Sequence, residues 1–404
     1  MTPATCEVAV VGAGIAGVSV ALELVRRGVD VELLDRGAVS GGTTGLGEGN
    51  VLCARAEPGP RLELTRLGQA LYREIEDDLG AEARIRRKGA LVVHRHADRP
   101  AAGHEGPAAR DEGLAPGREH VARMRAAGVP CSVVEGAELR ALEPRLAHDV
   151  AGAERFPDDL QCDARSITRA LARELERRGG RVRTGVEVRG VRVLRGRVTG
   201  LATAEGPLSC RAVVLAAGPW SAPLATSAGL DLPVEPRKGQ LALTGVAGPA
   251  WVRHKLLDGA YAAAVASDDA ALRIATVVET TWDGRVIVGS SRERRGFDLS
   301  VAPGVTAAMV EHAAGLVPEV AGLAVERAWA GLRPFLPDHR PAVGPSRVVD
   351  GLWASTGHEG AGVALGPISG RLVAQALCGE PPALDLEPFA VDRFHGAPRP
   401  AAGG

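Results

Sequence analysis

Three glycines near the start of the chain have the spacing of a phosphate-binding turn. Gly12, Gly14 and Gly17 form the pattern G-x-G-x-x-G, in which the first permits a tight turn and the second lets a pyrophosphate approach the backbone. The third lets the following helix pack closely on its strand, and the N-terminus of that helix favours an anion. Asp35 follows Gly17 by 18 residues, where a carboxylate can accept from a ribose hydroxyl. The combination predicts a dinucleotide with an unphosphorylated ribose, FAD or NAD.

The residues around this turn predict the elements that must hold it. Glu7–Val11 is short, apolar and β-branched, like a parallel strand buried on both faces. Ile15–Arg27 predicts a helix that Gly28 ends, and Val29–Leu34 predicts the next strand. The apolar run Val8–Val25 therefore indicates a buried strand, turn and helix rather than a signal peptide or membrane span, because no basic segment precedes it. This pattern predicts a cytoplasmic protein.

The rest of the chain alternates between helical and strand-like segments. Pro60–Leu79, Arg165–Arg178 and Gly362–Leu377 have helical patterns, and strand-like runs occupy most of residues 181–216. Residues 97–118 are rich in alanine, glycine, proline and charge without periodicity, and they predict an exposed loop.

The order of these segments predicts a fold of the α/β class, α+β overall, with a discontinuous Rossmann-like domain for the dinucleotide. That domain would comprise residues 1–88, 155–225 and 330–404, because a glycine-rich stretch and a helix return near the end of the chain. An inserted mixed-sheet domain for the substrate would comprise residues 89–154 and 226–329.

The composition restricts the chemistry of the chain. Its 404 residues are 45% hydrophobic and 24% charged, with a formal net charge of -1, so no basic surplus points to nucleic acid or anionic membrane. The six cysteines are scattered without metal-ligand spacing, which argues against an iron–sulfur or zinc site within this chain. Lysine is almost absent, so an anionic substrate would meet an arginine, which can hold a carboxylate through two hydrogen bonds.

Five later segments extend the pattern over most of the chain. They are Gly41–Gly45, Gly185–Val188, Leu215–Ser221, Gly331–Pro334 followed by Asp338, Pro341 and Gly344, and Gly357–Gly362. In this order they resemble the FAD-dependent amino-acid and amine oxidoreductases that include D-amino-acid oxidase, glycine oxidase and sarcosine oxidase. The resemblance implies that FAD is the cofactor. It implies FAD contacts from Gly12, Gly14, Ile15, Ala16, Gly17, Asp35, Arg36, Thr43, Thr44, Gly45, Gly49, Val188, Ala217, Gly218, Trp220, Arg333, Gly357, His358, Gly360, Gly362 and Val363.

Three segments have a closer resemblance to one subgroup. Thr43–Asn50, Glu279–Arg285 and Gly289–Glu293 resemble the flavin subunits of hydrogen cyanide synthase, opine oxidase and D-hydroxyproline dehydrogenase. Those subunits work beside a second subunit that carries iron–sulfur chemistry. The resemblance implies that electrons leave through such a partner rather than to oxygen. A homo-oligomer is the alternative assembly.

The candidate catalytic residues are Arg333, His358 and Tyr261. The resemblance implies that Arg333 binds the substrate carboxylate, whereas its structural alternative is an ion pair with Asp338. His358 would place positive charge or a hydrogen-bond donor near flavin N1, or would serve as a capping or core histidine. Tyr261 matches a tyrosine of the subgroup and would line the pocket or fill the core.

Four further side chains are weaker candidates. Arg292 is a second candidate for binding the carboxylate, and Glu48 would lie beside the substrate amine or, as the default for a loop, in solvent. Lys238 and Lys255 would help to activate oxygen in an oxidase or, as the default, carry surface charge.

The resemblance implies oxidation of the C–N bond of a small amino acid or secondary amine to an imine, by hydride transfer to flavin N5 and without a metal. Some relatives tether FAD through a cysteine or a histidine. Neither Gly331–Asp338 nor Gly41–Asn50 contains either residue, so we expect non-covalent FAD. Two alternatives remain. An NAD-dependent dehydrogenase would use the same glycine turn, and an electron-transfer subunit would bind flavin without turning over a substrate.

Overall fold

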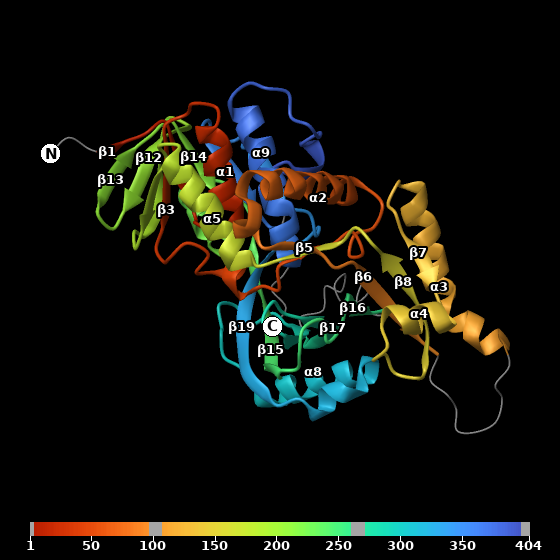
Figure 1. Cartoon of the computed structure of the whole chain (residues 1–404). Coiled ribbons are helices and arrows are strands. Elements are labelled where there is room, and N and C mark those ends of the chain that lie inside the picture. Colours follow the sequence, from red (N-terminus) through yellow and green to blue (C-terminus); the bar gives the residue numbers. More distant parts are fainter. Residues whose placement is uncertain (1–3, 97–106, 260–270, 397–404) are drawn as a thin grey trace.

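The structure, a computed structural model, describes residues 4–96, 107–259 and 271–396, and two large sheets dominate it (Figure 1). Six strands form one sheet and eight form the other, and two small sheets of four and three strands accompany them. The arrangement is a mixed α/β fold. The limits predicted for the two domains stay a prediction.

Strands from the start, middle and end of the chain meet in the six-stranded sheet. Five of the six run parallel, and β20 pairs antiparallel with its neighbour. In spatial order they are β10 (Arg181–Thr184), β3 (Val31–Asp35), β2 (Val8–Val11), β14 (Ala212–Leu215), β21 (Leu352–Thr356) and β20 (Ala342–Pro345).

The centre of this sheet is buried on both faces because successive side chains point in opposite directions. Val8 and Val10 pack into the core under the helices, whereas Ala9 and Val11 pack into a second core on the other face. A four-stranded sheet covers that second face. Its strands are β1 (Ala4–Thr5), β13 (Gly206–Ser209), β12 (Arg197–Thr203) and β11 (Val188–Leu194).

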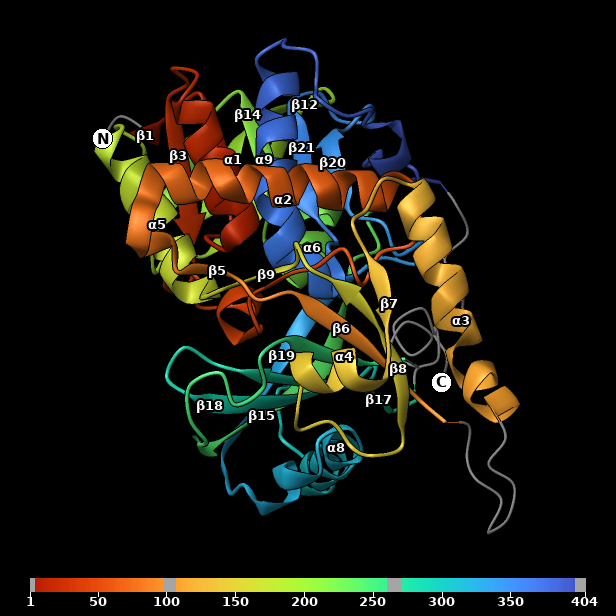
Figure 2. The same ribbon diagram turned by 45° about the vertical axis from the view of Figure 1, so that its right-hand side comes forward.

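The helices predicted from the sequence cover the first face. The structure places α1 at Ile15–Val25, α2 at Pro60–Leu79, α5 at Ala164–Arg177 and α9 at Gly362–Leu377, which confirms all four to within two residues. Helix α1 packs between α5 and α9, and α2 lies across α9 (Figures 1 and 2). Helices from the N-terminal and the C-terminal parts of the chain therefore lie side by side over one sheet.

The eight-stranded sheet lies on the other side of the molecule and carries α8 (Pro303–Leu316) on its outer face (Figure 2). Met309, Ala313 and Leu316 pack there against Val278 and Val288. In spatial order its strands are β19 (Val325–Phe335), β15 (Glu235–Val246), β18 (Arg285–Arg292), β17 (Arg273–Thr280), β16 (Lys255–Asp258), β6 (Ala90–Arg95), β8 (Val150–Phe156) and β7 (Ser132–Val134).

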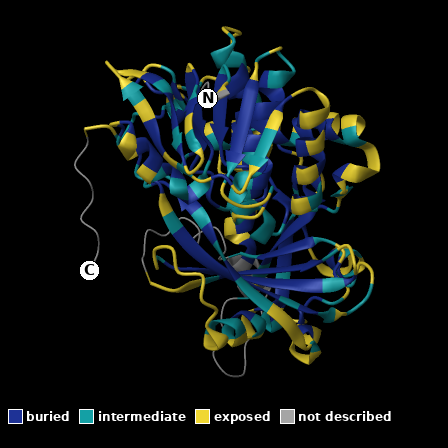
Figure 3. Cartoon of the chain, turned by 90° about the vertical axis from the view of Figure 1, so that its left-hand side faces the viewer, coloured by how far each residue is buried: buried dark blue, intermediate teal, exposed yellow. Residues whose placement is uncertain are grey.

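A small three-stranded sheet and two short helices accompany these layers. Figure 3 shows that most of both sheets is buried, while the outer sides of the helices are exposed. The three-stranded sheet comprises β4 (Asn50–Val51), β9 (Leu160–Cys162) and β5 (Ile85–Arg87), and the remaining short helices are α4 (Gly136–Leu142) and α6 (Ser221–Ser227).

The exposed loop predicted for residues 97–118 is wrong where the structure describes it. Helix α3 (Pro107–Ala126) occupies its second part, and residues 97–106 lie outside the described ranges. Leu114, Val121 and Met124 are buried against the neighbouring strands β6 and β8. This stretch has few apolar residues and contains Pro116, so its sequence shows no helical periodicity. Tertiary packing rather than propensity holds this helix.

Candidate active site

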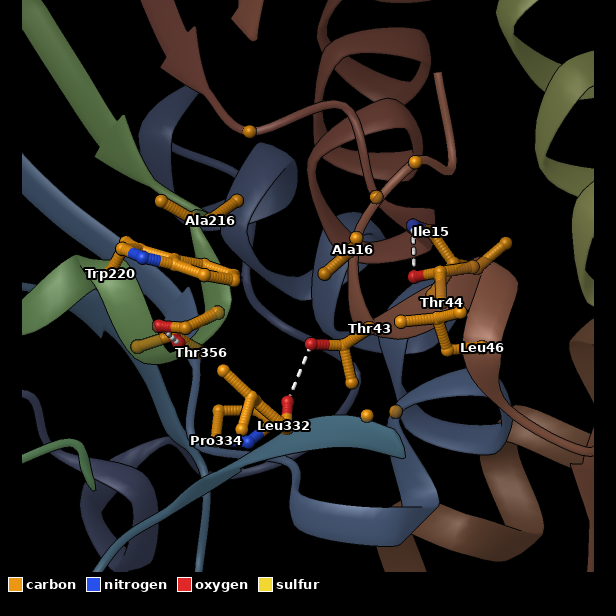
Figure 4. Close-up of a pocket in the computed structure, with 18 of the residues that line it drawn as sticks. Ile15, Ala16, Thr43, Thr44, Leu46, Ala216, Trp220, Leu332, Pro334 and Thr356 are labelled. Carbon is orange, nitrogen blue, oxygen red and sulfur yellow. Dashed lines mark hydrogen bonds between the residues drawn. The ribbon is translucent and has the colours of Figure 1, made fainter. Parts of the chain in front are cut away.

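A cavity of about 780 Å³ lies where the carboxyl ends of the six-stranded sheet meet β15 and β19 of the other sheet (Figure 4). Its volume lies in the usual range for cofactor and substrate sites. Most of the predicted FAD contacts line it, namely Gly12, Gly14, Ile15, Ala16, Asp35, Arg36, Thr43, Thr44, Gly49, Val188, Ala217, Gly218, Trp220, Arg333, His358, Gly360, Gly362 and Val363. Gly17, Gly45 and Gly357 are not part of this lining.

The glycine turn forms the wall between β2 and α1. Gly12 has a φ of +109°, and a Cβ atom there would lie 2.5 Å from the carbonyl oxygen of Ala216. A Cβ atom at Gly17 would lie 1.8 Å from the carbonyl oxygen of Gly12, so only glycine lets helix and strand come this close. Gly14 caps α1 without a side-chain hydrogen bond of its own, and the N-terminus of a helix favours an anion.

Asp35 is held at the end of β3 by two backbone groups. Its carboxylate accepts hydrogen bonds from the N–H groups of Ala13 and Gly37, each at 2.7 Å. Each oxygen keeps further acceptor capacity, as a ribose hydroxyl would require. Next to it, the Arg36 guanidinium lies 4.4 Å from the ring centroid of Trp220, and both side chains line the cavity.

The early threonine loop joins the glycine turn to the eight-stranded sheet. Thr44 Oγ1 accepts from the backbone N–H of Ile15 at 3.1 Å, and Thr43 Oγ1 donates to the carbonyl of Leu332 at 2.6 Å (Figure 4). Behind them, Arg165 Nε donates to the carbonyl of Gly45 at 2.7 Å. The loop is therefore fixed from both sides of the cavity.

Arg333 projects from β19 onto the cavity wall. Its Nη1 donates to the carbonyl of Ser291 at 3.0 Å, and its guanidinium packs on Gly239, where a Cβ atom would lie 1.9 Å from Nη1. The alternative ion pair with Asp338 is wrong, because Asp338 accepts instead from Arg340 and Arg393.

A second arginine reaches the same place, and the sequence reasoning missed it. Arg55 also lines the cavity, and a Cβ atom at Gly360 would lie 3.0 Å from Arg55 Nη2 and 3.6 Å from Arg333 Nε. The two guanidinium groups therefore come together beside Gly360. No pattern around Arg55 marks it out among the many arginines of the chain. Arg292 is buried in β18 and is not part of the cavity lining.

His358 lines the cavity as a neutral side chain. Burial lowers its pKa to about 4, and Nε2 lies 3.0 Å from Ser369 Oγ. The predicted positive charge is therefore wrong at neutral pH, whereas a hydrogen-bonding role remains open to the ring. Tyr261, the third candidate catalytic residue, lies outside the described residues.

Glu359, the next residue, was not predicted. It lines the cavity with a φ of +49°, which is strained for any residue but glycine. Its Oε1 lies 2.7 Å from His339 Nδ1, and its buried Oε2 has no hydrogen-bond partner within the described ranges. A strained residue with an unsatisfied oxygen on a cavity wall is typical of a ligand-binding site.

The lysines are buried, contrary to the predicted surface charges. Lys238 and Lys255 are 3% and 1% exposed, and Lys238 lies 2.6 Å from Asp298. Lys255 bridges Glu48 and Glu279, with 3.2 Å from its Nζ to Glu279 Oε2. Their partners come from segments far apart in the sequence, which is why no local pattern revealed them.

Glu48 is likewise mostly shielded from solvent. It lines the cavity, and its side chain is 10% exposed. Burial alone would raise its pKa, but the charge of Lys255 and hydrogen bonds from Lys255 and Asn50 lower it to about 2. Lys88 joins this cluster through Glu279 Oε1 at 3.4 Å, and burial lowers its pKa to about 8. The cavity thus has an ionised carboxylate on one wall and guanidinium groups on another.

Two further properties can be stated for the described ranges. No group of three or more histidine, cysteine, aspartate or glutamate side chains is arranged to hold a metal ion. None of the helices there combines the length and the apolar character that a membrane span needs.

Comparison with known proteins places the cavity in a family context. Residues 7–376 match the family described as FAD dependent oxidoreductase. A glycine oxidase from Pseudomonas aeruginosa is 30% identical over 95% of this chain and 98% of its own length. Hydrogen cyanide synthase subunit HcnC from Pseudomonas protegens is 33% identical over 66% of this chain, and the match spans 60% of that subunit. The crystal structure of glycine oxidase from Geobacillus kaustophilus superposes with a TM-score of 0.82 at 26% identity, over 96% of this chain and 99% of that one. The last match confirms the predicted mixed α/β fold.

Proposed function

Because the chain belongs to the FAD-dependent oxidoreductase family, we propose that it oxidises the C–N bond of a small amino acid or secondary amine to an imine. The observation that carries this proposal is the guanidinium of Arg333, which lines the cavity while Ser291 and Gly239 fix its position. Its parallel N–H donors match the two oxygens of a carboxylate, as an amino-acid substrate requires.

FAD is the cofactor of this family, and the residues of the cavity fit it. Gly12 and Gly14 leave space for a pyrophosphate at the N-terminus of α1, and Asp35 offers acceptors for a ribose. When bound, FAD supplies the acceptor for the hydride that leaves the substrate carbon. Gly331–Asp338 and Gly41–Asn50 contain no cysteine or histidine, which supports non-covalent binding.

The chain's own residues would bind the substrate, orient it and exclude water. Arg333, assisted by Arg55, would hold the carboxylate beside Gly360 and so fix the position of the α-carbon. Aliphatic side chains of Leu46, Leu241 and Leu332 line the same cavity and keep it dry. His358 would act as a neutral hydrogen-bonding group, and Tyr261 remains a proposed pocket residue.

We propose that electrons leave the reduced enzyme through an iron–sulfur partner protein rather than to oxygen. The similarity to a chain named as a subunit of hydrogen cyanide synthase supports an assembly with a second chain. Direct reaction with oxygen is the competing candidate, which the names of the glycine oxidase relatives support.

Anaerobic reduction of the purified flavoprotein tests both proposals. We expect glycine, sarcosine, proline or a D-amino acid to bleach the flavin absorbance in the absence of oxygen. Persistent bleaching after air is readmitted would support a protein acceptor, and rapid recolouring would support oxygen. Failure of every amine in such a panel to bleach the flavin would contradict the proposed substrate class.

A variant of Arg333 separates carboxylate binding from chemistry. We expect Arg333→Met to raise KM for the best amino acid by about 30-fold or more, because the substrate carboxylate loses its charged partner on the cavity wall. Arg340→Met is the matched control, since Arg340 pairs with Asp338 and does not line the cavity. An unchanged KM in Arg333→Met would remove Arg333 from substrate binding.

A further inference from the structure

Asn50 lies on the cavity wall, and its side chain carries one acceptor, Oδ1. It is the first residue of β4, lines the cavity and is 7% exposed. We propose that Asn50 Oδ1 accepts a hydrogen bond from the N–H of the substrate amine, and so selects primary and secondary amines over tertiary amines and over substrates that lack nitrogen. This inference rests on the proposed function and names a specificity-determining residue for it.

The orientation of the Asn50 amide follows from its neighbours. The Lys255 ammonium can only donate, and it donates to Glu48. Glu48 is an ionised carboxylate, which can only accept, and it takes a hydrogen bond from Asn50 Nδ2 at 2.8 Å to its Oε2. Nδ2 is therefore fixed on Glu48, and the acceptor end of the amide is turned away from it.

The acceptor end is left without a partner. Asn50 Oδ1 is buried and makes no hydrogen bond within the described part of the chain. A buried carbonyl oxygen without a donor costs free energy, so a ligand that brings a donor to this wall is favoured. A carboxylate, an ether or a tertiary amine in its neutral form brings no donor, whereas a neutral primary or secondary amine keeps at least one N–H.

The wall that carries Asn50 is suited to a neutral amine. The two lysines and two glutamates of the cluster balance in charge, since Lys88 and Lys255 face Glu48 and Glu279. Arg55 adds a positive charge that also acts on Glu48. A substrate ammonium would enter beside these cations, and the two carboxylates there are already paired with lysines. The neutral form of the amine is therefore favoured. Removal of a hydride from the carbon requires this neutral form.

Binding of two non-reacting carboxylates to the purified flavoprotein tests the inference without turnover. Pyrrole-2-carboxylate and furan-2-carboxylate have nearly the same shape, but the first presents an N–H donor and the second an oxygen acceptor. Titration followed by the flavin absorbance gives a Kd for each. We expect the wild type to prefer the pyrrole by about tenfold, which corresponds to about 1.4 kcal/mol.

Two variants assign the preference to the Asn50 amide. Asn50→Leu keeps the size of the side chain without its acceptor, and we expect the ratio of the two Kd values to fall close to one. In Glu48→Gln the neutral amide both donates and accepts, so Asn50 can turn its Nδ2 towards the ligand. We expect a smaller ratio there, mainly through tighter binding of the furan. Glu326→Gln, at an exposed pair with Arg285, is the control and should keep the wild-type ratio.

The outcomes separate this inference from the proposed function. Equal Kd values in the wild type, or no binding of either ligand, would overturn the inference even if amines bleach the flavin. A preference that persists in Asn50→Leu would also overturn it. The competing donor is an N–H of the reduced cofactor. In that case Asn50→Leu would shift the flavin midpoint potential without changing the ratio, which would overturn the assignment to the substrate.

Discussion

The two large sheets contribute to the cavity in different ways. The six-stranded sheet offers mainly backbone, since its turns carry Gly12, Gly14 and Gly218 and a Cβ atom at Gly12 would collide with Ala216. The eight-stranded sheet and the segments beside it offer charged side chains, among them Arg333 and the fully buried Lys255 with its two carboxylate partners. One side thus fits a cofactor that all members of the family share. The other side offers charges that can distinguish substrates.

The largest effect should come from filling the side of the cavity that the six-stranded sheet lines mainly with backbone (the backbone side). In Gly17→Ala the new Cβ atom would lie 1.8 Å from the Gly12 carbonyl oxygen, so α1 must move away from the turn. We expect the purified variant to retain no FAD, as measured by the ratio of flavin to protein absorbance. Gly28→Ala is the control, because a Cβ atom there would meet no other atom within 4 Å, although the φ of Gly28 is positive. It should lose about 1 kcal/mol of stability and stay yellow.

Breaking the charge cluster of the other side should have the next largest effect. Lys255→Met leaves Glu48 and Glu279 buried without their shared cation, and we expect the free energy of unfolding to fall by about 3–5 kcal/mol. Urea unfolding measures this change. Arg197→Met breaks an exposed pair with Asp350 and should cost less than about 1 kcal/mol. Equal losses in the two variants would show that burial of the cluster contributes nothing.

On the backbone side, acidification should reveal the burial of His358, and the effect should be intermediate. The pKa of His358 is about 4 in the folded protein, against 6.5 for the free side chain, because burial disfavours the charged form. As pH falls through this window, the unfolded chain binds a proton that the folded chain does not. We therefore expect the free energy of unfolding to drop by on the order of 3 kcal/mol from this group between about pH 7 and about pH 4.

His358→Gln isolates this contribution. The variant cannot bind the proton in either state, so its unfolding free energy should fall less on acidification than that of the wild type. Parallel pH profiles of urea unfolding give the difference. Identical profiles for the two proteins would mean that His358 titrates normally in the fold.

The stacked side chains at the rim of the cavity should have the smallest effect. Trp220→Leu removes the contact with Arg36 at 4.4 Å, which is worth about 0.5–1 kcal/mol, so we expect FAD to bind about two- to fivefold more weakly. Fluorescence titration of FAD into the apoprotein gives the Kd. Trp251→Leu is the matched control, because Arg145 lies 5.0 Å from that ring, outside the cavity. A large loss of affinity in Trp220→Leu would place binding energy on side chains rather than on backbone.

The sequence predicted the backbone side well, and it predicted poorly the side that the eight-stranded sheet lines with charged residues. Gly12, Gly14 and Gly17 could be interpreted because a local backbone requirement fixes both residue type and spacing. Helix α2 was predicted at Pro60–Leu79 because its apolar period is local too. Arg333 was found through resemblance, not through its own pattern.

The errors share one physical cause. Lys255 lies 207 residues from Glu48 and 24 residues from Glu279 along the chain, so only the fold brings the three side chains together. The same holds for Arg55 beside Arg333. Burial likewise decides the charge of His358, and burial of a few apolar residues holds α3 as a helix. No local pattern contains this information.

The cofactor content of the purified protein shows most directly whether the cavity binds FAD. We expect one FAD per chain, and precipitation with acid should release all of it into solution, since the cavity between the two sheets holds it without a covalent bond. A protein that purifies without flavin and fails to take up FAD on reconstitution would contradict FAD binding in this cavity.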